Sequence, residues 1–157
     1  MLGPLQLTQI EEVLQTQAVG RIGCSADGET YVVPISYAYD GNFIYCHSYE
    51  GKKLAIMRKN PKVCFQVDNM HDMANWKSVI VQGHFEEMLT QEEKSIAMHA
   101  LLHRYLPLVS SVTTHLGKNW PFEPYDISEI NGVVFRIAII KKTGRFEASS
   151  QSPFLAG

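Results

Sequence analysis

Residues 30–68 read TYVVPISYAYDGNFIYCHSYEGKKLAIMRKNPKVCFQVD, and this stretch decides the fold. Two runs rich in β-branched and aromatic residues flank the turn Asp40-Gly41-Asn42. Asp-Gly between two such runs is a strong hairpin signal. The sequence therefore predicts that residues 30–39 and 43–47 form paired antiparallel strands, with the second strand ending at Ser48.

A short basic helix is expected directly after this hairpin, over residues 52–59. Ser48 is a favourable helix N-cap, Gly51 lets the backbone approach a ligand, and Lys52 and Lys53 stand in the first turn. Unpaired N–H groups at a helix start, the positive end of the helix dipole and two ammonium groups together suit a phosphate. From composition alone, a pair of solvated surface lysines explains the same residues.

The remaining sequence favours an antiparallel barrel with helices outside it. Further strands are predicted at four places: residues 19–25, 63–67, 76–88 and 133–141. Gly83 is the expected position of a bend or bulge. Capping boxes that begin at Thr8 and Thr90 open two further helices, and the proline at position 34 indicates an edge strand or a strand that a ligand approaches.

Two stretches are interpreted as loops. Residues 69–75 are polar and weakly patterned, and residues 108–131 contain two prolines and form an irregular cover. The total is about six strands with two or three helices, which indicates a mainly β, closed or partly closed barrel.

The composition describes one ordinary globular domain. The chain has 157 residues, of which 45% are hydrophobic and 19% charged, and its formal net charge is -2. This balance does not favour a nucleic-acid partner. No stretch reaches the about 20 apolar residues that a membrane-spanning helix needs, and no leader pattern is present. We therefore expect a single domain over residues 1–148, a tail over residues 149–157, and a cytoplasmic protein without a nucleic-acid or membrane partner.

Cysteines and histidines do not indicate a disulfide framework or a metal site. Cys24, Cys46 and Cys64 are odd in number and lie far apart in predicted strands, which is typical of reduced, packed thiols. His99 and His103 are one helical turn apart, but the Glu of the zinc-protease motif is missing and no third ligand is evident.

Several of these motifs resemble the FMN-binding split β-barrel superfamily of the pyridoxamine 5'-phosphate oxidases, and most closely its nitroimidazole-resistance (Nim) branch. Five segments carry the likeness: VPISYAYDG at 33–41, YCH at 45–47, GKK at 51–53, RKNP at 58–61 and SVIVQG at 78–83. The resemblance implies an antiparallel split β-barrel with flanking helices, FMN as cofactor, and a homodimer with the flavin at the subunit interface.

The resemblance also implies a set of site residues. The strand along the flavin corresponds to Tyr31, Val32, Val33, Pro34, Ile35 and Ser36. The phosphate falls at Ser48, Lys52 and Lys53, and the remaining cofactor positions are Cys46, His47, Ser78 and Val79. His47, which the Nim pattern shares, is the candidate catalytic residue, because a positioned histidine can act as acid, base or donor. A barrel-end histidine without a ligand is the alternative.

Departures from the oxidase pattern argue against pyridoxamine phosphate oxidation. The flavin strand of the oxidases begins with Arg and ends with a Lys that helps to hold the substrate, whereas Tyr31 and Ser36 stand here. The resemblance therefore implies an FMN-dependent oxidoreductase that reduces small aromatic or nitro compounds with electrons from NAD(P)H. The alternative is a non-catalytic flavin or haem binder in storage or stress response. A partner-chain aromatic, Trp76 or Trp120, is expected to close the pocket.

Overall fold

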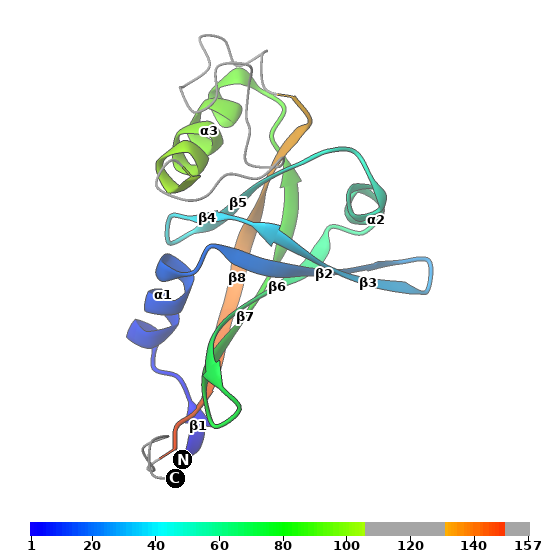
Figure 1. The fold of residues 1–157 in the computed structure, drawn as a ribbon. Coiled ribbons are helices and arrows are strands. Elements are labelled where there is room, and N and C mark those ends of the chain that lie inside the picture. Colours follow the sequence, from blue (N-terminus) through cyan, green and yellow to red (C-terminus); the bar gives the residue numbers. More distant parts are fainter. Residues whose placement is uncertain (106–130, 150–157) are drawn as a thin grey trace.

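A computed structural model describes residues 1–105 and 131–149 of the chain. Within these residues there are eight strands and three helices (Figure 1), in the order β1 Leu2–Pro4, α1 Leu7–Thr16, β2 Val19–Ala26, β3 Glu29–Ser36, β4 Ala38–Tyr39, β5 Phe43–Ser48, α2 Lys52–Lys59, β6 Lys62–Asp72, β7 Asn75–Glu87, α3 Gln91–Tyr105 and β8 Val133–Glu147. The prediction of a mainly β fold with flanking helices is confirmed. The two strands beyond the expected count of about six come from β1 and from the division of residues 30–39 into two strands.

All eight strands belong to one antiparallel sheet. Its order is β3-β2-β6-β7-β8-β5-β4, with β1 paired to β8. The sheet curls until β3 comes close to β5, but these two strands do not pair. The result is a barrel that is open along one seam, between β3 and β5, as the split-barrel prediction requires.

The barrel interior is a single apolar core that includes Ile22, Phe65, Val81 and Phe135, all with no exposed surface. Helix α1 adds its buried face to this core, and the Tyr37 hydroxyl donates a 2.7 Å hydrogen bond to the backbone oxygen of Leu14 on that helix. A second, smaller apolar cluster lies between α3 and the strands β4, β5 and β8. Helix α2 lies on another side of the barrel, against β2 (Figure 1).

The hairpin predicted at Asp40 is confirmed only next to its turn. β5 pairs with the two-residue strand β4, whereas β3 pairs along its whole length with β2. The run breaks at Tyr37, whose N–H donates to the backbone oxygen of Ala18 and whose ring is buried against Phe65. The prediction of one strand over residues 30–39 is therefore wrong, because a local pattern does not specify which neighbour a strand chooses.

Strand ends are also corrected. Residues 69–75 are not a loop: β6 continues to Asp72 and β7 starts at Asn75. β8 continues past residue 141 to Glu147, because β1 and β7 both pair with its second half. The bulge predicted at Gly83 is confirmed by a register shift between Gln82 and Gly83.

The two capping boxes differ in outcome. At α3 the box is confirmed, since Thr90 Oγ1 accepts from the Glu93 N–H at 3.2 Å and the Glu93 carboxylate accepts from the Thr90 N–H at 3.3 Å. At α1 the prediction is wrong, because the helix already begins at Leu7 and the Gln6 N–H donates to Gln9 Oε1 at 2.9 Å.

Residues 106–130 and 150–157 lie outside the described residues. They include all of the expected loop over residues 108–131 except Asn131, and all of the expected tail over residues 149–157 except Ser149. In the described ranges, no helix has the length and apolar character needed to cross a membrane.

Candidate functional site

Strand β3 comes close to β5 at the open seam of the barrel, and Lys52 from the first turn of α2 reaches Glu29 and Tyr31 of β3. β3 pairs with β2 on one side only, so within the described residues the backbone N–H and C=O groups of its other edge have no strand partner. Pro34 lies in this strand, which agrees with the edge-strand interpretation because proline cannot donate to a ladder. Such an edge offers alternating donors and acceptors to a flat ligand.

The first turn of α2 has no capping side chain. Gly51 is the N-cap residue, and the first turn contains no acidic residue. Ser48 is not the cap, as its hydroxyl donates to the backbone oxygen of Tyr49 at 2.9 Å, and the predicted role of Ser48 as N-cap is wrong. An uncapped helix start that carries Lys52 and Lys53 is unfavourable on its own and is stabilised by an anion.

Gly51 leaves space next to this helix start. Its backbone is extended, and a Cβ atom added there would meet only the backbone oxygen of Tyr49, at 4.0 Å. Nothing in the described protein therefore requires glycine at this position. The open space is available to a ligand.

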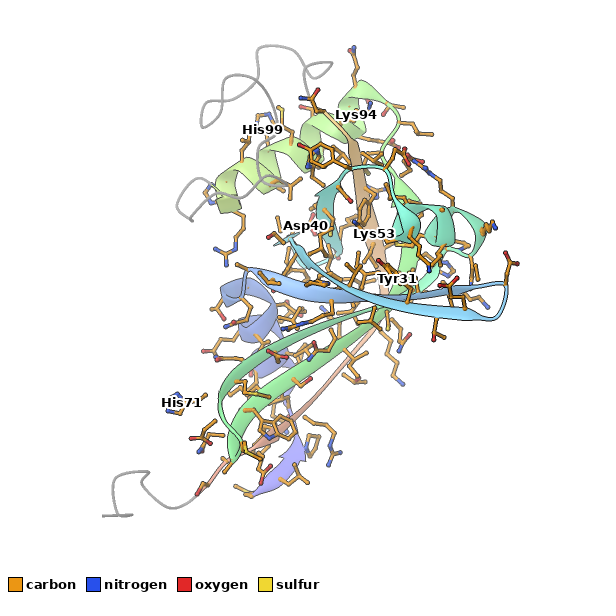
Figure 2. The ribbon with its side chains drawn as sticks, turned by 45° about the vertical axis from the view of Figure 1, so that its right-hand side comes forward. Tyr31, Asp40, Lys53, His71, Lys94 and His99 are labelled. Carbon is orange, nitrogen blue, oxygen red and sulfur yellow. The ribbon has the colours of Figure 1, made fainter. Side chains whose placement is uncertain are left out.

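The two lysines have different surroundings. Lys52 forms an ion pair with Glu29, and its ammonium group lies 5.4 Å from the centre of the Tyr31 ring. Hydrogen bonding to Glu29 and attraction by its charge raise the pKa of Lys52. Lys53 is partly buried and has no ion pair within the described residues, although it lies on the same side of the barrel as Tyr31 (Figure 2). Of the two lysines at this helix start, Lys53 is therefore the one whose ammonium group has no carboxylate partner among the described residues.

His47 is enclosed by the chain itself. Only 1% of His47 is exposed, its Nε2–H donates to the backbone oxygen of Asn131, and its ring lies edge-on to Tyr49 with 5.7 Å between ring centres. Gly132 crosses over it at φ +85°, where a Cβ would come within 3.1 Å of His47 Nε2. In this arrangement the imidazole is closed off from solvent, and the catalytic role of His47 stays a prediction.

Other predicted cofactor residues are buried in the core. Cys46 and Val79 have no exposed surface, Ile35 is 7% exposed, and Val33 packs against the same core. Burial raises the pKa of the Cys46 thiol, and the nearby charge of Lys53 acts in the opposite direction. Within the described protein, these residues can meet a ligand through their backbone groups more readily than through their side chains.

The rest of the predicted set lies on the outer face of the sheet. Val32 is 70% exposed there, and Pro34 is also exposed, while Ser36 is partly buried. Ser78 is three strands away from β3, and its hydroxyl accepts a 2.9 Å hydrogen bond from Gln66 Nε2. The structure therefore brings Tyr31, Lys52 and Lys53 together at the seam but places Ser78 elsewhere.

Sequence reasoning missed an ordered polar cluster on this outer face. Gln66 Nε2 also donates to Asp68 at 3.1 Å, and Asp68 in turn pairs with Arg21 at 3.2 Å. Arg21 is the register partner of Pro34. Alternation along β6 does place Gln66 and Asp68 on its polar face, but only the pairing of β6 with β2 brings Arg21 beside them.

A groove of about 460 Å³ lies on the same outer face. Tyr31 and Val32 form part of its wall, and the other lining residues include Cys64, Gln82 and Ile140. The groove is therefore continuous with the strand predicted to run along the flavin.

The remaining aromatic and histidine candidates are Trp76, Trp120, His99 and His103. The Trp76 indole donates to Glu147 at 3.1 Å, near the β6–β7 turn and distant from α2 (Figure 1), and Trp120 lies outside the described residues. His99 and His103 are exposed on α3. In the part of the chain that the structure describes, no group of three or more His, Cys, Asp or Glu residues could hold a metal ion, and all three cysteines are free thiols.

Comparison with known proteins supports the split-barrel fold. A family model described as pyridoxamine 5'-phosphate oxidase matches residues 7–145. The chain belongs to the pyridoxamine 5'-phosphate oxidase family. The chain is similar to a FAD-binding protein from Mesorhizobium loti, whose crystal structure superposes with a TM-score of 0.71, at 33% identity over 94% of this chain and 99% of that chain.

Two further similarities bear on this family member. A proposed 5-nitroimidazole antibiotic resistance protein from Bacteroides thetaiotaomicron VPI-5482 superposes with a TM-score of 0.70 at 19% identity, over 93% of this chain and 87% of that one, which shows a shared fold. The uncharacterized protein RA0666 of Rhizobium meliloti (strain 1021) is 39% identical over 80 residues. The aligned stretch spans about half of each protein, 51% of this chain and 53% of the other.

Proposed function

We propose that this member of the pyridoxamine 5'-phosphate oxidase family binds a flavin nucleotide at the seam between β3 and β5 and acts as an oxidoreductase. The observation that carries the proposal is Lys53: a partly buried cation without a carboxylate partner in the described residues, at an uncapped helix start. The relative from Mesorhizobium loti, at 33% identity, is named a FAD-binding protein, which supports a flavin as the ligand.

The described residues are compatible with the two ends of a flavin nucleotide. The phosphate would meet the backbone N–H groups at the start of α2 together with Lys52 and Lys53, and Gly51 leaves room for it. The flat ring would lie along residues 33–36 of β3, where the free strand edge supplies donors and acceptors. A bound flavin supplies the redox chemistry, and the protein supplies binding, orientation and electrostatics.

FMN and FAD both carry a phosphate at the position that α2 would hold. The sequence resemblance favours FMN, whereas the name of the Mesorhizobium loti protein specifies FAD. We propose FMN as the cofactor. The binding experiment includes both nucleotides, together with riboflavin, which lacks the phosphate.

The proposed activity is reduction of small aromatic or nitro compounds with electrons from NAD(P)H. The sequence likeness to the Nim branch supports it, and the Bacteroides protein, which shares the fold, is itself a proposed nitroimidazole-resistance protein. A cytoplasmic location accompanies this proposal, because NAD(P)H is a cytoplasmic reductant.

Absorbance spectroscopy tests the proposal directly. The purified protein should bind FMN, and the flavin absorbance should bleach with NAD(P)H under anaerobic conditions and return on adding air or a nitroaromatic compound. Flavin that binds but stays oxidised would leave the non-catalytic binder as the function. A Soret band without any flavin binding would overturn the cofactor and the site.

A paired substitution tests the site. The double variant Lys52→Ala/Lys53→Ala should lose most of its FMN affinity while its circular dichroism and melting temperature are unchanged, because two charge-assisted phosphate contacts are removed. The matched control is Lys59→Ala/Lys62→Ala, which removes the same charge at and just beyond the other end of α2. Unchanged FMN occupancy in the first variant would show that the phosphate binds elsewhere.

We also propose a homodimer that pairs the outer sheet faces. Val32, Ile80 and Ile140 are 70%, 43% and 65% exposed on β3, β7 and β8, and no described helix covers this face. In such a dimer, the partner's Trp76 would approach the flavin. Sedimentation of Ile140→Asp should show monomers with reduced flavin occupancy, whereas the control Ile96→Asp, at a 55% exposed position on α3, should sediment like the unmodified protein. Monomers in the unmodified protein would contradict the dimer.

A further inference from the structure

Arg58, in the last turn of α2, binds two carboxylates at once. Its Nη1 and Nη2 atoms donate to Glu50 at 2.7 and 2.8 Å, and its Nε and Nη2 atoms donate to Glu87 at 3.2 and 2.6 Å. Each carboxylate therefore receives two parallel hydrogen bonds from one guanidinium group. Bidentate pairs of this kind fix the orientation of both partners, and a lysine cannot reproduce them.

The two carboxylates come from different parts of the fold. Glu50 lies between β5 and α2, immediately before the N-cap Gly51, and Glu87 is the last residue of β7. Arg58 is six positions after the first residue of α2, which places it about 9 Å along the helix axis from that end. The Arg58 and Glu50 side chains together span this distance, and Arg58 links the segment before α2 to the end of a barrel strand.

This link acts on the segment where position matters most for the proposed site. Gly51 has no side chain to restrain it, and no side chain caps the helix start. The Glu50 side chain is itself 65% exposed, whereas Glu87, at 25% exposure, is more firmly seated on the barrel. Hydrogen bonding from Arg58 lowers the pKa of the Glu50 carboxyl, so this partner is ionised at neutral pH.

We infer that Arg58 is a positioning residue for the cofactor phosphate: through Glu50 and Glu87 it holds residues 49–51 in place, so that the N–H groups at the start of α2 converge on one point. The inference rests on the proposed function. Arg58 itself does not touch the phosphate, because both sides of its guanidinium are occupied by carboxylates.

A purely structural role for Arg58 makes a different prediction. If the two ion pairs only attach α2 to β7, breaking them affects every ligand of the seam equally. If they position the phosphate-binding segment, breaking them affects FMN and leaves riboflavin, which has the same ring but no phosphate, unaffected. The ratio of the two dissociation constants separates these roles without any measurement of turnover.

The test uses Arg58→Lys, which keeps the positive charge but cannot form two forks. We expect the dissociation constant for FMN, from fluorescence titration, to rise about tenfold, because a preorganised binding segment becomes mobile. The constant for riboflavin should stay within about twofold of the unmodified value. The matched control is Lys59→Arg, one position further along α2 at a lysine that pairs with Asp27, and neither constant should change.

A second variant approaches the same link from the other end. Glu87→Gln removes the anchor on β7 but leaves Arg58 paired with Glu50. Glu87→Gln should show the same selective loss of FMN affinity. If Arg58→Lys does not fold, this variant still tests the positioning role.

The outcomes separate this inference from the proposed function. If the unmodified protein prefers FMN to riboflavin and both variants keep that preference, or lose affinity for both ligands equally, the positioning role is overturned and the proposed function stands. If the unmodified protein binds FMN no better than riboflavin, the phosphate site at α2 is itself wrong, and the role of Arg58 is overturned with it.

Discussion

Lys52 on helix α2 is paired with Glu29, the first residue of the edge strand β3. Both side chains are 53% exposed, so the pair lies at the surface of the seam. A phosphate that binds at the start of α2 therefore competes with the Glu29 carboxylate for the Lys52 ammonium group. Glu29 is expected to weaken phosphate binding.

Glu29→Gln should accordingly bind FMN more tightly. Surface ion pairs are weak because water screens them, so we expect a decrease of only about two- to fivefold in the FMN dissociation constant. Riboflavin binding should not change. Asp27→Asn is the control, because it breaks the 3.0 Å pair with Lys59 at the other end of the same helix. Weaker FMN binding by Glu29→Gln would mean that the pair supports the site.

The two lysines should contribute unequally. Lys53→Gln should raise the FMN dissociation constant by about tenfold or more, because a charge-assisted contact to phosphate is lost. Lys52→Gln should have a smaller effect, since Glu29 already offsets its charge. Titration of both single variants, with melting temperatures as the folding control, checks the order. Equal effects would show that the Glu29 pair opens without cost when FMN binds.

Two glycines should respond differently to alanine. Gly51→Ala should keep the stability of the protein, because its Cβ meets only one atom, at 4.0 Å, but it should reduce FMN affinity by occupying the space beside α2. Gly83→Ala should lower the free energy of unfolding by about 1–3 kcal/mol, because its Cβ would lie 2.5 Å from the Ala138 backbone oxygen. Urea denaturation measures the stability of both variants, and FMN titration measures the affinity of Gly51→Ala. A Gly51→Ala variant with reduced stability would contradict the expectation that an alanine side chain fits beside α2.

A partly buried network connects α1 to the barrel and should make stability depend on pH. Lys142 donates to Glu11 at 2.5 Å and to the Tyr39 hydroxyl at 3.0 Å, and Tyr39 donates to Glu11 at 2.6 Å. Burial opposes ionisation of Glu11, but the hydrogen bonds from Lys142 and Tyr39 outweigh it and lower the pKa below 4.5. A lowered carboxyl pKa stabilises the fold above the ordinary pKa, and this contribution disappears as the pH falls through the folded value.

Lys142→Met should therefore lose about 1–3 kcal/mol of stability at neutral pH, because Glu11 is left without its cation. The difference from the unmodified protein should shrink at an acidic pH, where Glu11 becomes protonated as the pH falls through its lowered pKa. Urea denaturation at both pH values measures it. A difference that stays constant with pH would assign the effect to packing alone.

His47 provides a test of structure against catalysis. His47→Ala should cost about 1–3 kcal/mol of stability, because a side chain that is only 1% exposed is removed together with its hydrogen bond to the Asn131 carbonyl. His47→Gln keeps an N–H donor at a similar reach and should restore most of that loss. The rate of flavin reduction per bound flavin in His47→Gln separates the two roles, because an unchanged rate would leave His47 as a structural residue. Loss of that rate with normal stability would support the catalytic role instead.

Local sequence patterns determined the elements whose cause is itself local. Helix α2 was predicted from residue 52 to residue 59, as observed, because Asn60-Pro61 ends any helix there. The capping box at Thr90 and the bulge at Gly83 likewise follow from the chemistry of single residues. The family resemblance supplied the barrel and the candidate site, since its motifs occur in order along the chain.

Pairing and orientation were decided only by the tertiary structure. Residues 30–39 look like one strand, but Tyr37 must bury its ring and bind Leu14, so the run breaks and β3 joins β2. The same holds for the charges: Glu29 and Lys52 are far apart in the sequence, and only the closing of the barrel brings them together. Periodicity fixes which face a residue occupies, whereas long-range packing selects the neighbour that the residue meets.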